Sequence, residues 1–204
     1  MIKQENRLPF PKGQKFVFLD RDGIINVDHG YVYRPRDFEF VPGFTELLGE
    51  LFRRDFEPVV VTNQSGVARG YFTLGDVVKF HDTMNEKLFE ILGRKIDHIY
   101  ICPHHPNGTN PQYTAECNCR KPKPGLVQTF LEDTGFSSHL EGSKLNSSFW
   151  EGSILIGDKT SDVELGKRIG VKTFQLNGGN YPVSPDVDHE VKSLAEIVPI
   201  LDRT

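Results

Sequence analysis

The stretch FVFLDRDGIIN, residues 16–26, constrains the fold more than any other part of the chain. Its first four residues are apolar and mostly aromatic or β-branched, which predicts a buried strand. Asp20 and Asp22 follow directly, and Gly23 allows a sharp turn. Two carboxylates so close together repel each other and lose solvation, and a divalent cation with oxygen ligands, typically Mg²⁺, relieves both penalties. The pair therefore predicts phosphoryl chemistry, with one carboxylate as nucleophile and the other as proton donor. A surface turn built on Asp and Gly is the alternative.

Length and composition point to one domain spanning residues 1–204. Residues 1–13 are expected to form a loose N-terminal tail, because two prolines and a glycine near their end resist regular structure. A Ser/Gly-rich insertion at 137–153 contains the only tryptophan and is predicted to be a surface excursion. We expect a monomer.

Charge and apolar content exclude several classes of partner. The net charge of -4 and the pI near 6.0 argue against nucleic-acid and membrane-surface binding. The chain shows neither a secretory signal nor an apolar run near the ~18 residues that a membrane span requires. Three cysteines cannot all pair with one another, which argues against a disulfide scaffold. The sequence thus predicts a cytoplasmic protein.

Apolar strands alternate with amphipathic helices along the chain. Strands are predicted at about 15–19, 58–62, 96–101, 154–157 and 171–176. Helices are predicted to begin near Pro42, at a capping box formed by Thr73 and Asp76, at 124 and near Asp162. A short last helix ends near Leu201. This alternation predicts an α/β fold, a doubly wound parallel sheet with helices on both faces. Ligands of such sheets bind outside the carboxyl ends of the strands.

Polar residues stand at three of these predicted strand ends. Asp20 ends the first strand, Thr62 the second and Asp158 a later one. The segment TNQSG, residues 62–66, offers a hydroxyl and backbone N–H groups to a phosphate, although it would also serve as a turn. Asp158 fits the missing ligand of a metal site, with Asp162 nearby, although either could be a helix N-cap.

Cysteine and histidine pairs bracket a Pro- and Asn-rich loop at 102–119. Cys102 and His104 form one pair, and Cys117 and Cys119 the other, a spacing typical of a closed structural Zn²⁺ site. His105 could replace His104 as ligand. Arg120 and Lys121 follow the last cysteine directly, so a zinc clamp would aim their charges at an anionic ligand; a solvated basic loop is the alternative.

Taken together, these motifs resemble a known family. DRDG, the TN pair, a later lysine and GD followed by another Asp resemble the motifs of haloacid dehalogenase superfamily phosphatases. INVDHGYV, TNQSGVARGYF, CPHHP and CNCRKPKPG are similar to the bacterial D-glycero-D-manno-heptose-1,7-bisphosphate 7-phosphatases. These belong to a subgroup that also contains histidinol-phosphate phosphatases. The similarity covers most of residues 15–177.

The resemblance implies a role for each matching residue. Asp20 would form an aspartyl-phosphate, and Asp22 would protonate the leaving sugar oxygen and then activate water. Mg²⁺ would be held by Asp20, by the backbone carbonyl of Asp22 and by Asp158, with Asp162 assisting from outside the ligand set. The phosphoryl oxygens would be held by Thr62, Asn63 and Lys121. Substrate binding is assigned to Gln64, Ser65, Arg69 and Arg120, and Zn²⁺ to Cys102, His104, Cys117 and Cys119.

The spacing between these motifs leaves no room for a separate cap domain. Substrate choice would therefore rest on the loops 27–42, 65–71 and 103–120, which suits a small phosphorylated sugar. Three other functions compete with the sugar bisphosphatase. They are a phosphatase of histidinol phosphate or another small phosphomonoester, a phospho-acceptor signalling domain of the receiver type, and a zinc-dependent nucleic-acid module, which the acidic balance opposes.

Overall fold

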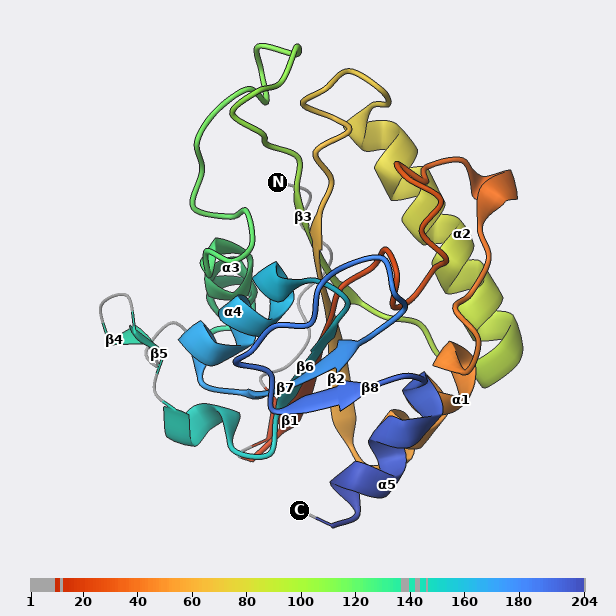
Figure 1. The fold of residues 1–204 in the computed structure, drawn as a ribbon, viewed down its shortest axis with the longest axis vertical. Coiled ribbons are helices and arrows are strands. Elements are labelled where there is room, and N and C mark those ends of the chain that lie inside the picture. The colour runs from red at the N-terminus through yellow and green to blue at the C-terminus, as the bar shows by residue number, and fades with distance from the viewer. Residues whose placement is uncertain (1–9, 12, 137–139, 142–143, 146, 204) are drawn as a thin grey trace.

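A single six-stranded parallel sheet organises the molecule, in the order β3-β2-β1-β6-β7-β8 (Figure 1). The computed structural model describes residues 10–11, 13–136, 140–141, 144–145 and 147–203. The α/β doubly wound sheet expected from the sequence is confirmed. Its strands are β1 (Lys15–Leu19), β2 (Phe56–Asn63), β3 (His98–Cys102), β6 (Ile154–Gly157), β7 (Lys172–Leu176) and β8 (His189–Val191).

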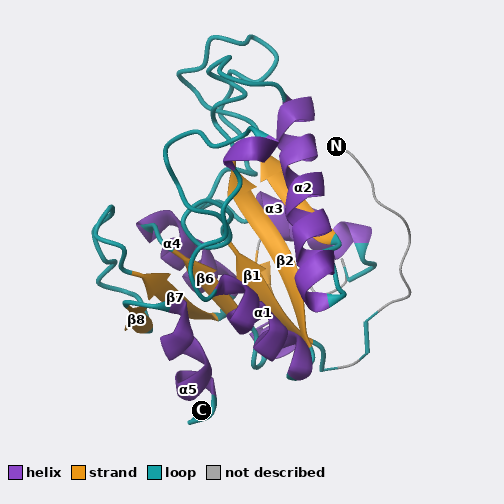
Figure 2. Ribbon diagram, turned by 90° about the vertical axis from the view of Figure 1, so that its right-hand side faces the viewer, coloured by secondary structure: helices purple, strands orange, loops and turns teal. Residues whose placement is uncertain are grey.

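Helices cover both faces of the sheet (Figure 2). One face carries α1 (Phe44–Arg53), α2 (Leu74–Leu92) and α5 (Ile197–Leu201), and the other carries α3 (Gly125–Asp133) and α4 (Thr160–Ile169). The central strand β1 alternates between two cores: Val17 and Leu19 face the first layer, and Phe16 and Phe18 the second. All four side chains are fully buried, as expected of a parallel strand covered on both sides.

Local signals set the helix starts. The predicted capping box is present, since the Thr73 hydroxyl accepts from the backbone N–H of Asp76, whose carboxylate accepts from the backbone N–H of Thr73. By contrast, α1 does not begin at Pro42. Gly43 has a left-handed φ of 83°, which is incompatible with a right-handed helix, and α1 begins one residue later.

Aromatic side chains from the described parts of the 1–13 and 137–153 segments pack into the core. Residues 1–9, 12, 137–139, 142–143 and 146 lie outside the described part. Within the expected surface excursion, β4 (Leu140–Glu141) pairs with β5 (Lys144–Leu145), but Trp150 is buried and meets the Phe18 ring edge-on at 5.3 Å. Phe10, in the expected tail, packs on Phe16 at 5.2 Å. Aromatic burial therefore anchors both segments.

The strand order places a ligand site beside β1. The chain runs from β1 through β2 to β3 on one side, then restarts at β6 on the other, so the order reverses between β1 and β6. This arrangement matches the 3-2-1-4-5-6 order of doubly wound sheets and differs from the 2-1-3-4-5 order of receiver domains. The connection from β1 to β2 contains only the 3₁₀ turn η1 (Pro35–Asp37) and α1, and that from β2 to β3 only α2. The fold is thus uncapped, as predicted.

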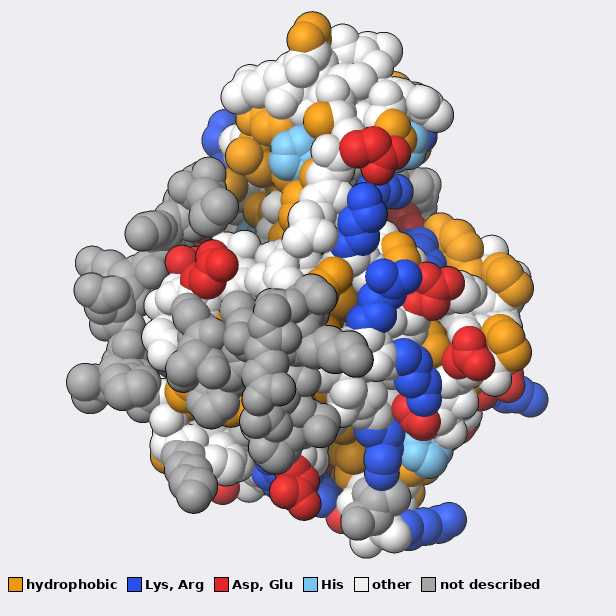
Figure 3. Space-filling view, turned by 90° about the vertical axis from the view of Figure 1, so that its left-hand side faces the viewer, with side chains coloured by type: hydrophobic (Ala, Val, Ile, Leu, Met, Phe, Trp, Pro, Cys, Tyr) orange, Lys and Arg blue, Asp and Glu red, His pale blue; other side chains and the backbone are white. Residues whose placement is uncertain are grey.

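None of the helices in the described ranges is both long and apolar enough to cross a bilayer. On the face shown in Figure 3, Lys and Arg side chains stand beside Asp and Glu side chains rather than forming a patch of one charge.

Phe18→Ala tests the importance of the central strand. We expect the free energy of unfolding to fall by about 3–5 kcal/mol, because the substitution empties a fully buried site between Trp150 and Phe130. Urea denaturation measures this change. Ile91→Ala, which removes a 57% exposed side chain of α2, is the control and should change stability by less than about 0.5 kcal/mol. Equal losses in both variants would contradict the two-core description.

Candidate active site and metal centre

Asp20, directly after β1, lies at the centre of a group of buried charges. Its Oδ1 atom is 2.8 Å from Nζ of Lys121, which is also 2.6 Å from Oδ1 of Asp162. All three residues are nearly inaccessible to solvent. Burial alone would lower the pKa of Lys121, but the Asp162 and Asp20 carboxylates outweigh burial and raise it. Lys121 is therefore a fixed cation beside the predicted nucleophile.

Three carboxylates form a compact set of oxygen donors. Asp20, Asp158 and Asp162 each offer an oxygen, and these oxygens lie within 4.8 Å of one another. A Cβ on Gly157 would lie 2.3 Å from Cβ of Asp162, so glycine is required for Asp162 to approach the end of β6. Burial and the neighbouring Asp20 raise the pKa of Asp158 to about 7. Buried oxygen donors that repel one another fit a hard divalent cation.

Asp22 is held on both sides by hydrogen bonds. Its Oδ1 accepts from Nη2 of Arg21 at 2.6 Å and from Nδ2 of Asn26 at 3.0 Å, and its Oδ2 accepts from Nε2 of Gln64 at 2.8 Å. Burial would raise the pKa of Asp22, but the Arg21 guanidinium and these hydrogen bonds outweigh burial and lower it. The resting side chain is therefore a carboxylate in a fixed orientation.

The carboxyl end of β2 links the two halves of the site. The side-chain oxygen of Asn63 accepts from the backbone N–H of Lys121 at 3.0 Å, and its amide nitrogen donates to the Lys121 carbonyl at 3.3 Å. Asn63 thus fixes the backbone of the lysine that faces Asp20. Thr62 is fully buried and accepts from Nε2 of Gln64 at 2.8 Å.

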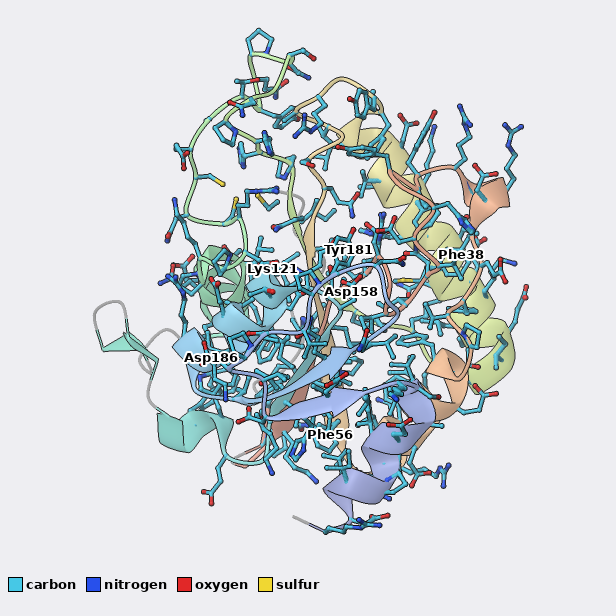
Figure 4. The ribbon with its side chains drawn as sticks, in the orientation of Figure 1. Phe38, Phe56, Lys121, Asp158, Tyr181 and Asp186 are labelled. Atoms are coloured by element: carbon cyan, nitrogen blue, oxygen red, sulfur yellow. The ribbon has the colours of Figure 1, made fainter. Side chains whose placement is uncertain are left out.

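A cavity of about 360 Å³ opens onto some of these groups, whereas Thr62, Asp158 and Asp162 are not among its lining residues. Figure 4 shows Lys121, Asp158 and Tyr181 together beyond the strand ends. Arg69 is not among the lining residues; it meets Nε2 of His105 at 3.2 Å. A larger hollow of about 750 Å³ lies within the 29–39 loop, but it contains none of the predicted catalytic residues. The predicted site residues that line the smaller cavity are Asp20, Asp22, Asn63, Gln64, Ser65, Arg120 and Lys121.

Several residues of the site were not predicted. Nζ of Lys159 lies 3.4 Å from Oδ1 of Asp158 and 3.7 Å from Oδ2 of Asp28. The same ammonium lies 4.7 Å from the centre of the Tyr181 ring. Its position directly after Asp158 was an available signal, because a lysine at a strand end beside an acid faces the same edge. Tyr31, from the 27–42 loop expected to select the substrate, also lines the cavity, in a left-handed conformation with φ of 54° that an aromatic residue rarely adopts.

The cysteine and histidine pairs converge as predicted. Sγ of Cys119 lies 3.2 Å from Sγ of Cys102, 3.4 Å from Sγ of Cys117 and 3.3 Å from Nδ1 of His104. A tetrahedral Zn²⁺ with bonds of about 2.3 Å separates sulfur ligands by about 3.8 Å. These distances are consistent with a zinc site. His105 does not belong to the cluster, because its ring nitrogens meet Asn107 and Arg69.

Comparisons with known proteins agree with this geometry. The HAD-hydrolase-like family matches residues 118–199. The chain is 36% identical to the D-glycero-beta-D-manno-heptose-1,7-bisphosphate 7-phosphatase of Haemophilus ducreyi over 93% of its own length and all of the relative. It is 38% identical to the enzyme of the same name from Helicobacter pylori J99, with 90% of this chain and 95% of that one covered.

A solved structure has a similar fold over most of its length. The D,D-heptose 1,7-bisphosphate phosphatase from B. bronchiseptica, complexed with magnesium and phosphate, superposes with a TM-score of 0.72 at 27% identity. The match covers 93% of this chain and 98% of that one. With an uncapped fold, a buried acid site and relatives similar over their full length, the chain belongs to the D-glycero-beta-D-manno-heptose-1,7-bisphosphate 7-phosphatase family of HAD-like phosphatases.

Proposed function

We propose that this chain is a Mg²⁺-dependent phosphatase that removes the 7-phosphate of D-glycero-D-manno-heptose 1,7-bisphosphate. The observation that carries the proposal is the position of Asp20, a buried carboxylate at the end of the central strand, 2.8 Å from the Lys121 ammonium and in the same cavity as Asp22. The names of the relatives support the substrate and specify its beta anomer, which we expect this chain to prefer.

The reaction divides between two carboxylates. An oxygen of Asp20 attacks the phosphorus, and the bond to the sugar oxygen breaks to leave an aspartyl-phosphate. For this step Asp22 must be protonated in the substrate complex, and it gives that proton to the departing oxygen. In the second step Asp22 takes a proton from a water molecule, whose oxygen attacks the phosphorus, so that phosphate leaves and Asp20 is restored. The carboxylate form of Asp22 that Arg21 favours is the form this second step requires.

Further groups would bind the substrate. The phosphoryl oxygens contact Thr62, Asn63 and Lys121, whose donors offset the charge that develops in the transition state. Arg120, at the rim of the cavity, suits the second phosphate because its guanidinium can donate two parallel hydrogen bonds. Ser65 is a further contact to the sugar, whereas Arg69 acts on the 103–120 loop through His105.

Two metals complete the proposal. Mg²⁺ would be held by Asp20, Asp158 and the backbone carbonyl of Asp22, and it would neutralise charge on the phosphoryl group. Asp162 would assist from outside this ligand set, as the family resemblance implies, by pairing with Lys121. Zn²⁺ in the Cys₃His cluster is structural, since four protein ligands leave no open position.

Phosphate release from a panel of substrates tests the function. With Mg²⁺, we expect the beta anomer of the heptose bisphosphate to be hydrolysed with the highest kcat/KM. The competitors are the alpha anomer, fructose 1,6-bisphosphate, histidinol phosphate and p-nitrophenyl phosphate. Asp20→Asn, whose amide cannot attack phosphorus, should abolish turnover of all five. A preference for histidinol phosphate would replace the proposed substrate, and the absence of release from any would refute the enzyme.

The pKa of Asp158 predicts a pH dependence of Mg²⁺ binding. This pKa is raised to about 7, so Mg²⁺ must displace a proton from Asp158 below pH 7 but not above it. We expect the Kd for Mg²⁺, measured by calorimetry, to be about tenfold weaker at pH 6 than at pH 8. Mg²⁺ should correspondingly raise the melting temperature more at pH 8. Equal affinity at the two pH values would argue against Asp158 as a ligand.

Cys117→Ala tests the zinc clamp. The variant should lose bound zinc, measured by atomic absorption, and its melting temperature should fall, because no apolar core replaces the metal in the 103–120 loop. We also expect lower activity, since Lys121 is two residues beyond the ligand Cys119. Thr114→Ala is the control in the same loop and should keep its zinc. Unchanged zinc content in Cys117→Ala would rule out the proposed ligand set.

A further inference from the structure

Gln64 lies between Asp22 and Thr62, the two groups to which the proposed function gives roles at the phosphate. It directly follows β2, its side chain is only 3% exposed, and its backbone N–H donates to the Cys102 carbonyl at the end of β3. From this fixed backbone, Nε2 lies 2.8 Å from Oδ2 of Asp22 and 2.8 Å from Oγ1 of Thr62. One amide group therefore bridges the first strand end and the second.

The chemistry of its partners fixes the orientation of the Gln64 amide. The Asp22 carboxylate can only accept, so it must face the NH₂ group and not the amide oxygen. The second amide hydrogen points to Oγ1 of Thr62, which accepts it. The Thr62 hydroxyl then has its own hydrogen left to donate, and a phosphoryl oxygen needs such a donor.

The two oxygens of Asp22 accept hydrogen bonds from different side chains. Arg21 and Asn26 both donate to Oδ1, whereas Gln64 is the only side chain in the described ranges that donates to Oδ2. Arg21 cannot move to cover both oxygens, because its side chain is fully buried against the Phe80 ring, 4.6 Å away, and bonded to the Val32 carbonyl. Without Gln64, no side chain in the described ranges donates a hydrogen bond to Oδ2 of Asp22.

We propose that Gln64 is a positioning residue that aims the Asp22 carboxylate and the Thr62 hydroxyl at the reacting phosphate, and is not the substrate-binding residue expected from the sequence. The inference rests on the proposed function, in which Asp22 protonates the leaving oxygen. A displaced Asp22 would slow phosphoryl transfer most from those substrates whose leaving group needs a proton. An alkoxide needs one, and p-nitrophenolate does not.

The test compares kcat/KM for two substrates in Gln64→Met. This parameter reports the steps up to the first irreversible one, here the transfer of the phosphoryl group to Asp20. For the best sugar phosphate of the panel, we expect kcat/KM to fall about 100-fold, because a displacement of about 1 Å in an acid–base group has an effect of that size. For p-nitrophenyl phosphate we expect kcat/KM to fall less than tenfold, because only the altered orientation of the Thr62 hydroxyl affects this substrate. Gln64→Glu, which preserves side-chain size but repels Asp22, should show the same discrimination.

Gln14→Met is the matched control. Gln14 also bridges two groups through Nε2, the carbonyls of Lys15 and Asp55, but at the opposite end of β1 and β2. It should lose comparable stability and keep both rates. Equal falls for the two substrates in the Gln64 variants, or no fall, would overturn the inference alone. An inactive wild-type protein would overturn the proposed function, and the inference with it.

Discussion

The ion pairs of Lys121 with Asp20 and Asp162 are the interaction on which the rest of the site depends. Three buried carboxylates within 4.8 Å would repel one another strongly in a medium of low polarity, and an unpaired buried charge is severely destabilising. The lysine ammonium contacts two of the three. Lys159, from the turn after β6, stands near Asp158 and Asp20 on the other side. Lysines from two separate loops therefore offset the repulsion among the three buried carboxylates.

The placement of Lys121 explains why a metal-stabilised loop belongs to this fold. Lysine side chains have many rotamers, and holding one between two acids requires a rigid backbone. The Cys₃His cluster fixes the chain just before Lys121, while both side-chain atoms of Asn63 bond to the backbone of Lys121 itself. The loop has few apolar residues of its own, so the proposed Zn²⁺ would supply the rigidity that an apolar core supplies elsewhere.

The sequence predicted what is local or periodic. Asp20, Thr62 and Asp158 could be assigned to one edge because parallel strands end there together, and Cys102, His104, Cys117 and Cys119 could be grouped by ligand spacing. Side-chain direction in loops was out of reach: Gln64 turns towards Asp22, and Lys159 towards the cavity. Both outcomes depend on contacts with residues distant in the chain. Likewise β8 is too short and polar to be recognised alone, and it is defined by pairing with β7.

The position of β1 has a consequence for how the chain is made. Its neighbour β2 follows soon after it, but its other neighbour, β6, ends at Gly157. On the ribosome, one edge of this buried central strand therefore stays open until residue 157 has been synthesised. An unpaired edge of that kind is a template for association with other chains. The emerging chain exposes this edge until β6 has been made, and the acid site cannot assemble before the carboxylate of Asp158 has left the exit tunnel.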